Sequence, residues 1–170
     1  MEKIVQTERL LLRQFNVNDV DFIIQLLNSP GWIKNIGDRN IKTVEQAKNY
    51  LLNGPMQSYQ LHGFGLSLVM LKETNTPIGM CGLIKRDTLP HVDIGFAFLP
   101  AYIGKGYCYE MASAILMNAK NNFKLPRIVA VTLPTNISSV NVLKKLGMQF
   151  DKKIILKGDT EELELYGIDL

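Results

Sequence analysis

The sequence predicts an α+β fold, with a mixed, mostly antiparallel twisted sheet of about seven strands flanked by about four helices. Three observations support this class: a meander of three strand-like runs in mid-chain, helical runs on either side of it, and two strand-like runs at the C-terminal end. The expected order is β-α-α-β-β-β-α-β-α-β-β, with one right-handed crossover through a helix at 106–122. Because the 170 residues contain no repeat or linker, we expect a single domain over residues 1–170.

The N-terminal part is expected to contain one strand and two helices. Residues 8–15 read as a strand, and residues 20–27 carry apolar side chains at helical spacing, with Pro30 soon after as a stop signal. A Thr-x-x-Gln capping box opens a second helix at 43–52. Residues 32–42 show no clear period and stay unassigned.

The remaining elements follow from apolar runs that alternate with turn residues. Short polar turns join the three central strands, so they are expected to form an antiparallel meander. The elements are strands at 63–72, 77–86 and 91–99, a helix at 106–122, a strand at 127–133, a helix at 137–146 closed by Gly147, and two strands around Gly158.

Composition argues against several classes of protein. The net charge of +3 comes from scattered Lys and Arg, so we expect no nucleic-acid partner, although a mild positive balance suits an anionic cofactor. No apolar run approaches the roughly 20 residues that span a bilayer, and charges interrupt the N-terminus, so we expect no membrane partner and a cytoplasmic location. Two cysteines and two histidines give no metal-ligand spacing, so no metal site is expected.

The turn Gly104-Lys105-Gly106 lies between the strand at 91–99 and the helix at 106–122. The first amides of a helix lack intrahelical partners and favour an anion, and glycines let a phosphate approach the backbone. The spacing matches neither the GxxxxGK[ST] nor the GxGxxG phosphate loop. On this stretch alone, a diphosphate site and a plain structural turn are both open.

Three separated motifs change that balance. They are T-E-R-L-x-L-R at 7–13, P-x-Y-x-G-K-G-Y at 100–107 and N-x-x-S-x-x-V-L-x-K-L-G at 136–147. With them the chain resembles the GNAT-type N-acetyltransferases, most closely their RimJ/RimL-like branch. The resemblance implies a GNAT-like fold and transfer of an acetyl group from acetyl-coenzyme A, as co-substrate, to a primary amine.

The resemblance also implies which residues bind acetyl-coenzyme A. Amides of the glycine turn and the helix start would wrap the pyrophosphate, and the preceding strand would pair with the pantetheine arm. That pairing requires the strand at 91–99 to splay from the strand at 127–133. The implied residues are Phe96, Phe98, Gly104, Lys105, Gly106, Tyr107, Cys108, Tyr109 and Asn136, the last of which could instead be a helix cap.

Two residues depart from the family's pattern. Ile103 stands where Gln or Arg is usual and cannot make the same side-chain contact, and Cys108 stands at a Gly or Ala position. Because a helix N-terminus favours the thiolate, we expect the pKa of Cys108 to be lowered. The favoured interpretation is still that Cys108 is a small packing residue, and the alternative hypothesis is an oxidation-prone thiol that forms a mixed disulfide with coenzyme A.

Two side chains are candidates for the proton transfers in amine acetylation. Ser139 matches the Ser of the branch and is the candidate acid, because Leu143 stands where much of the superfamily has Tyr. The alternative interpretation of Ser139 is a residue that caps a helix start. Asp93 is the candidate base, with a pKa raised by burial, and His91 is the runner-up. A backbone N–H near Phe98 is the expected oxyanion donor.

The identity of the acceptor is open between a protein or peptide N-terminus and a small-molecule amine. The alternative function is a non-catalytic sensor domain that binds coenzyme A or acyl-coenzyme A. A nucleotide-binding protein whose glycine turn holds ATP phosphates is a third hypothesis. Edge strands of such a sheet allow a homodimer as well as a monomer.

Overall fold

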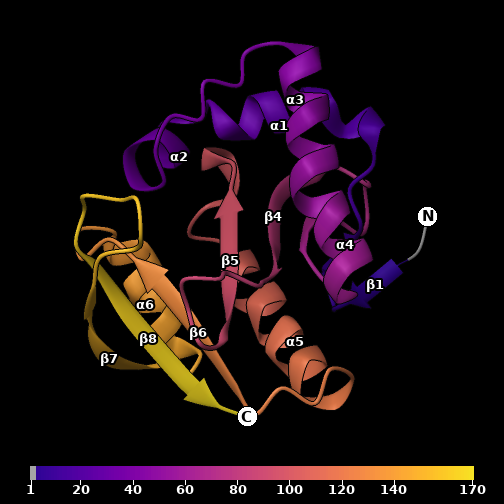
Figure 1. Cartoon of the computed structure of the whole chain (residues 1–170). Helices are drawn as coiled ribbons and strands as arrows, with labels where there is room; N and C mark the ends of the chain where they lie inside the picture. Colours follow the sequence, from indigo (N-terminus) through magenta and orange to yellow (C-terminus); the bar gives the residue numbers. More distant parts are fainter. Residues whose placement is uncertain (1–2) are drawn as a thin grey trace.

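The computed structural model describes residues 3–170, which form one eight-stranded sheet with helices on both faces (Figure 1). The strand order is β1-β2-β3-β4-β5-β6-β8-β7, and β5 and β6 are the parallel pair in an otherwise antiparallel sheet. The expected α+β class with a mixed, mostly antiparallel sheet is therefore confirmed. The strands are β1 (Lys3–Gln6), β2 (Leu10–Arg13), β3 (Leu66–Leu71), β4 (Pro77–Ile84), β5 (Val92–Phe98), β6 (Arg127–Thr132), β7 (Gln149–Ile154) and β8 (Leu163–Asp169).

The eighth strand comes from the N-terminal region. The run expected as one strand at 8–15 contains only β2, which pairs with β1 in an antiparallel hairpin. Residues 7–9 form the connection, in which the Thr7 amide donates to the Leu10 carbonyl at 3.0 Å. The expectation of seven strands was therefore one too few.

Residues 3–170 contain six α-helices, two more than expected. Helix α2 lies in the unassigned region, and Pro30 occupies its first position, where the missing amide of proline does no harm. The helix expected at 43–52 continues through a π-helical turn at Leu52–Met56 into α4, with Pro55 inside that turn. The helices are α1 (Val20–Leu27), α2 (Pro30–Asn35), α3 (Val44–Leu51), α4 (Gln57–His62), α5 (Tyr107–Asn121) and α6 (Ile137–Lys145).

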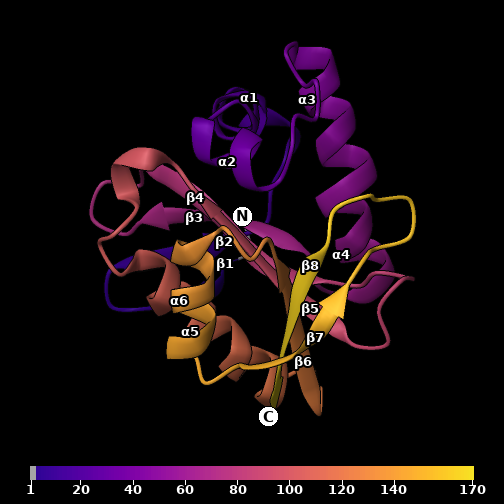
Figure 2. The same ribbon diagram turned by 90° about the vertical axis from the view of Figure 1, so that its left-hand side faces the viewer.

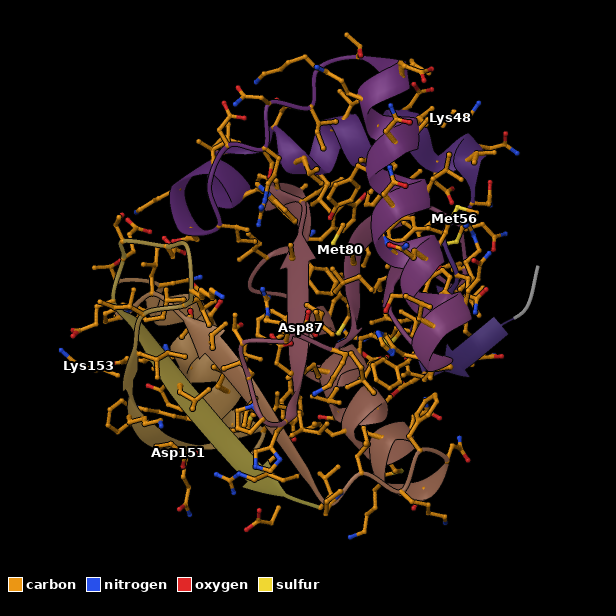
Figure 3. All side chains as sticks on the ribbon, in the orientation of Figure 1. Lys48, Met56, Met80, Asp87, Asp151 and Lys153 are labelled. Carbon is orange, nitrogen blue, oxygen red and sulfur yellow. The ribbon has the colours of Figure 1, made fainter. Side chains whose placement is uncertain are left out.

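The sheet lies between α1 and α3 on one side and α5 and α6 on the other (Figure 2). A hydrophobic layer packs against each of these two faces. Side chains of a strand alternate between faces, so Val69 packs in the layer under α5 and α6 while its neighbours Leu68 and Met70 pack under α1 and α3. Met80 of β4, labelled in Figure 3, belongs to the same layer as Leu68. Complete burial of each such side chain stabilises the fold by about 1.5–3 kcal/mol.

The parallel pair β5 and β6 stays together over only two residues. Val92 pairs with Ile128 and Asp93 with Val129, after which the strands diverge (Figure 1). Beyond Asp93, the edge of β5 that faces β6 has no strand partner within residues 3–170. The splay on which the expected cofactor position depends is therefore present.

Two classes of feature are absent from the described part of the chain. No helix within residues 3–170 is long and apolar enough to cross a membrane. No group of three or more His, Cys, Asp or Glu side chains in that range is placed to hold a metal ion. The expectations on location, metal and oligomeric state stay predictions.

Candidate functional site

Two cavities lie where β5 and β6 diverge. The loop-side cavity, of about 420 Å³, lies against the glycine turn and the start of α5. The Asp93-side cavity, of about 360 Å³, lies against Arg86, Asp93 and the connection between β7 and β8. They adjoin one another, because seven residues form walls of both. These are Trp32, Asn35, Ile36, Phe96, Ala97, Asn136 and Ser139.

The glycine turn leads into α5 with the left-handed backbone that only glycine adopts easily. Gly104 has a φ of +78° and Gly106, the N-cap of α5, has a φ of +82°. The N-cap makes no side-chain hydrogen bond to the helix, so the first amides of this 15-residue helix have no side-chain cap within residues 3–170. The helix dipole adds partial positive charge at the same place. The start of α5 can therefore receive an anion.

Two residues of the N-terminal hairpin, Thr7 and Arg9, brace the glycine turn together with Glu110 of α5. Arg9 donates from Nη1 to the Lys105 carbonyl at 3.2 Å, and its guanidinium lies 4.5 Å from the centroid of the Tyr107 ring. Arg9 Nε donates to Glu110 Oε2 at 2.7 Å, and Thr7 Oγ1 donates to Glu110 Oε1 at 2.6 Å. We call Thr7, Arg9 and Glu110 the Arg9 clamp, since they tie the hairpin to both the turn and α5.

The clamp carboxylate is held in its charged form. Partial burial raises the pKa of Glu110, but the hydrogen bonds from Thr7 and Arg9 outweigh that effect and leave the pKa below its usual value. The backbone amide of Arg9 also donates to Glu110 Oε1, at 2.9 Å. Glu110 thus accepts three hydrogen bonds besides the backbone contacts of its helix.

Most of the expected cofactor residues line the loop-side cavity. The exception is Lys105, which is exposed and lies outside the cavity wall, with Nζ 5.6 Å from the Tyr102 ring centroid. Lys145 of α6, which was not expected, lines the cavity and lies 4.4 Å from the Tyr109 ring centroid. The expected residues in the wall are Phe96, Phe98, Gly104, Gly106, Tyr107, Cys108, Tyr109 and Asn136.

The pKa of Cys108 differs from the lowered value expected of a thiol at a helix start. Burial raises the pKa of the Cys108 thiol well above its usual value, and the neighbouring Cys81 thiol raises it further. The expectation of a lowered pKa was wrong, because loss of water around the sulfur outweighs the helix N-terminus. Since the thiolate is the reactive form, the raised pKa supports the interpretation of Cys108 as a packing residue over the mixed disulfide.

Asn136 and Ser139 both lie at the start of α6 and line both cavities. Asn136 is the N-cap, and its Oδ1 accepts a hydrogen bond from the Ser139 backbone amide at 3.3 Å. The Ser139 hydroxyl has no hydrogen-bond partner within residues 3–170. Asn136 therefore has a structural role as a cap, and the Ser139 hydroxyl is left available to a ligand.

Asp93 is a buried carboxylate with one satisfied oxygen. Its side chain is 2% exposed, and Oδ2 accepts a hydrogen bond from Arg86 Nε at 3.0 Å. Burial raises the pKa of Asp93, and the charge and hydrogen bond of Arg86 oppose this only in part. Oδ1 is buried with no partner in the described part of the chain. His91, the runner-up base, lines neither cavity.

Trp32 supplies a second buried polar atom without a partner. The residue is 6% exposed and lines both cavities, and its Nε1 has no hydrogen-bond acceptor within residues 3–170. A buried donor or acceptor left unpaired costs about 1–3 kcal/mol, so native structures rarely contain one without a reason. Here one donor and one acceptor are unpaired in the wall of the same cavity.

Sequence reasoning missed several residues of the site. Arg86, Arg39 and Tyr50 line the Asp93-side cavity, and none of them was singled out. A signal existed for Arg86, since a buried Asp in a strand needs a cationic or donor partner nearby. Arg9 stood in a quoted motif, but its partner Glu110 is 101 residues away and carried no signal.

Comparison with known proteins identifies the class. Residues 9–149 match the family model described as an acetyltransferase (GNAT) domain. The uncharacterized N-acetyltransferase YnaD of Bacillus subtilis (strain 168) is 32% identical over 158 residues, covering 91% of this chain and 89% of YnaD. An acetyltransferase (GNAT family) structure from Bacillus anthracis is 27% identical, with a TM-score of 0.80 and 97% of both chains covered.

A third comparison concerns the fold alone. The structure of RimL, a ribosomal L7/L12 alpha-N-protein acetyltransferase in complex with coenzyme A, has a TM-score of 0.84 with 16% identity, and the match covers 99% of this chain and 98% of RimL. The match to the family model shows that the protein is an acyltransferase. It belongs to the GNAT acetyltransferases, whose reaction is acetyl transfer from acetyl-coenzyme A to an amine, and the alternative of a non-catalytic sensor is not supported.

Proposed function

We propose that acetyl-coenzyme A binds in the loop-side cavity and that an amine entering from the Asp93-side cavity attacks its thioester where the two cavities adjoin. The observation that carries this proposal is the splay of β5 from β6, which opens directly onto the glycine turn and the uncapped start of α5. We further propose that residues 1–170 act as one domain, of which residues 1 and 2 lie outside the described part.

The cofactor would be held mainly by backbone groups. The pyrophosphate would accept hydrogen bonds from amides between Gly104 and Tyr109, with Lys145 as a cation in the cavity wall. The pantetheine arm would pair with the free edge of β5 from Phe96 to Phe98, in the manner of an added strand. Asn136, at the shared wall, would contact the same arm.

The chemistry needs a neutral amine, a stabilised oxyanion and a leaving thiolate. We assign Asp93 to remove the proton from the ammonium, directly or through water, because it lines the cavity and burial raises its pKa above the ordinary value. The nitrogen then forms a bond to the carbonyl carbon, and a backbone N–H of β5 near Phe98 donates to the developing oxyanion. As the carbon–sulfur bond breaks, the Ser139 hydroxyl gives a proton to the thiolate of coenzyme A, and the second proton that the nitrogen loses as the amide forms restores the Ser139 hydroxyl.

Thermal unfolding with separate additions of acetyl-coenzyme A, coenzyme A and ATP tests the cofactor assignment. A ligand at about 100 times its dissociation constant stabilises the protein by about 2.7 kcal/mol, a shift of several degrees in Tm. We expect that shift with both coenzyme A compounds and not with ATP. Thiol release in the presence of amines then measures the transfer itself, and a protein that binds acetyl-coenzyme A but acetylates no amine would contradict the proposal.

A further inference from the structure

We infer that the acceptor is a small zwitterion, an amine that carries a carboxylate close to its nitrogen, as an α-amino acid does, and that the Asp93-side cavity binds both of its charges. This inference rests on the proposed function, since it names the substrate class of the same site. Polar groups that the cavity leaves without partners within residues 3–170 support it.

The two unpaired buried atoms require a ligand that both donates and accepts. Asp93 Oδ1 is a carboxylate oxygen and can only accept while ionised, whereas Trp32 Nε1 can only donate. An amine or ammonium supplies the donor for Asp93, and an oxygen of the same ligand supplies the acceptor for Trp32. A simple alkyl amine or a polyamine has no such oxygen and would leave the indole N–H unpaired.

The cationic groups of the cavity indicate that the ligand oxygen that accepts from Trp32 belongs to a carboxylate and not to a neutral group. Arg86 uses Nε on Asp93, and its two Nη groups have no hydrogen bond within residues 3–170. Arg39 lines the same cavity, is exposed, and makes no ion pair with the described residues. Burial raises the pKa of Tyr50, and the charge of Arg39 opposes this rise in part, so Arg39 acts on groups in this cavity wall. Guanidinium groups bind carboxylates in a matched, two-point geometry.

The acidic groups at the cavity do not reverse this preference. Asp159 and Glu161 lie on the connection between β7 and β8, and both are exposed. The Asp159 carboxylate already accepts hydrogen bonds from the backbone amides of Thr160, at 2.8 Å, and Glu161, at 3.4 Å. Only Glu161 is left as an uncommitted acid, and it stands at the solvent side, where it would attract the ammonium group.

The test compares matched sets of three acceptors with glycine, leucine and phenylalanine side chains. Each set contains the amino acid, its primary amide, and the amine that lacks the carboxyl group. We expect kcat/KM to be at least about tenfold higher for the amino acid than for the other two, the effect of one hydrogen bond to a charged group. A short peptide with the same N-terminal residue is a fourth arm, and it is expected to react no faster than the amide.

Variants of cavity residues test whether this cavity causes the preference for the amino acid over its amide. Arg39→Gln and Trp32→Phe, which keeps the aromatic ring, should each lower the ratio of kcat/KM for the amino acid to kcat/KM for its amide by about tenfold. Lys48→Gln makes the same charge change as Arg39→Gln on the exposed face of α3, outside both cavities, and should leave the ratio unchanged. An unchanged ratio in the Arg39 and Trp32 variants would overturn the inference.

A second readout separates this inference from the proposed function. Calorimetry measures binding of each amino acid to the protein saturated with coenzyme A. Acetylation at equal rates within every set, or faster acetylation of amides or peptides, would overturn the inference of a zwitterionic acceptor. The proposed acetyl transfer would stand. Binding of an amino acid without turnover would keep the zwitterion site and overturn the transfer mechanism. Neither binding nor turnover with any of the amino acids would overturn the inference.

Discussion

The two cavities differ in how far the protein satisfies the charged and buried polar side chains beside them. On the loop side, the Arg9 clamp gives the turn and Glu110 close partners from a distant hairpin, with contacts of 2.6 to 3.2 Å. On the Asp93 side, a carboxylate oxygen and an indole N–H are buried without partners in the described part of the chain. A cavity that is braced without its ligand is preorganised for it, whereas a cavity with unpaired groups is completed by what enters.

The difference matches the chemistry expected on each side. A diphosphate needs rigid backbone amides in one arrangement, and rigidity there reduces the entropy that binding would cost. An amine that must lose a proton and attack needs groups whose hydrogen bonds form only when it arrives. Changes on the loop side should therefore affect affinity for acetyl-coenzyme A, and changes on the Asp93 side should affect the reaction with the amine.

The largest expected effect is on the Asp93 side. Asp93→Asn keeps the shape of the side chain and removes its basicity, so we expect kcat with the amine to fall by about a hundredfold, the lower end for loss of a general base. The dissociation constant of acetyl-coenzyme A should change little. Stopped-flow thiol release and calorimetry measure the two quantities. A fall in cofactor affinity as large as the fall in kcat would show that the two sides are not separate.

On the loop side, Arg9→Ala removes the contacts to the Lys105 carbonyl, Glu110 and the Tyr107 ring. We expect the KM for acetyl-coenzyme A to rise by about tenfold, since a charged hydrogen-bond network is lost, with a much smaller change in the KM for the amine. The matched control is Arg127→Ala. Arg127 also holds two carboxylates, Asp151 at 2.6 Å and Asp169 at 2.7 Å, but lines neither cavity.

That control decides between positioning and general stability. If Arg9→Ala and Arg127→Ala raise the KM for acetyl-coenzyme A equally, the clamp has no specific role in the glycine turn. If both lower Tm but only Arg9→Ala changes the KM, the clamp positions the turn. The outcome is read as a ratio of KM values, which a loss of folded protein alone does not change.

A smaller effect is expected from the glycine turn itself. Gly104→Ala places a Cβ at a φ of +78°, but no atom lies within 4 Å of it. The change should therefore lower the free energy of unfolding by about 1–2 kcal/mol through backbone strain alone, and acetyl-coenzyme A should bind more weakly. Urea unfolding measures the first quantity and calorimetry the second. Full stability in Gly104→Ala would mean that the turn relaxes without consequence.

The sequence predicted the parts of the molecule that depend on local pattern. Helices α5 and α6 appear within a residue or two of their expected bounds, because a glycine cap and an apolar period mark each of them. The splay of β5 from β6 was implied only by family resemblance, since neither strand's own pattern encodes its distance from the other. The additional helices α2 and α4 were missed because each lies beside a proline, Pro30 or Pro55, that reads as a stop signal.

The contacts of the site were likewise predictable only where they depend on local sequence pattern. Asp93 was singled out as a strand acid, but the identity of its partner depends on how β4 and β5 pair, which brings Arg86 within 3.0 Å. The pKa of Cys108 was expected to fall with the helix dipole, a local effect, and it rises with burial, which only the packed core determines. Long-range contacts and desolvation are thus the parts that the sequence did not reveal.

The smallest expected effect is a pair of opposite pH dependences of stability, one from each side of the site. The folded protein raises the pKa of Asp93, so the contribution of Asp93 to stability is present below its ordinary pKa of 3.8 and is lost as pH rises through the raised value. The pKa of Glu110 is lowered, so its contribution is present above its ordinary pKa of 4.5 and is lost as pH falls through the lowered value.

Urea unfolding from pH 3 to pH 8, with steps of about one unit, measures both dependences against Asp93→Asn and Glu110→Gln. The stability of the protein relative to Asp93→Asn should decrease as pH rises, and its stability relative to Glu110→Gln should decrease as pH falls. The Glu110 change should be the weaker, because Arg9 is 44% exposed and solvent screens the pair. Two curves of the same sign would mean that Asp93 is better satisfied than its unpaired oxygen indicates, and the contrast between the two sides would then fail.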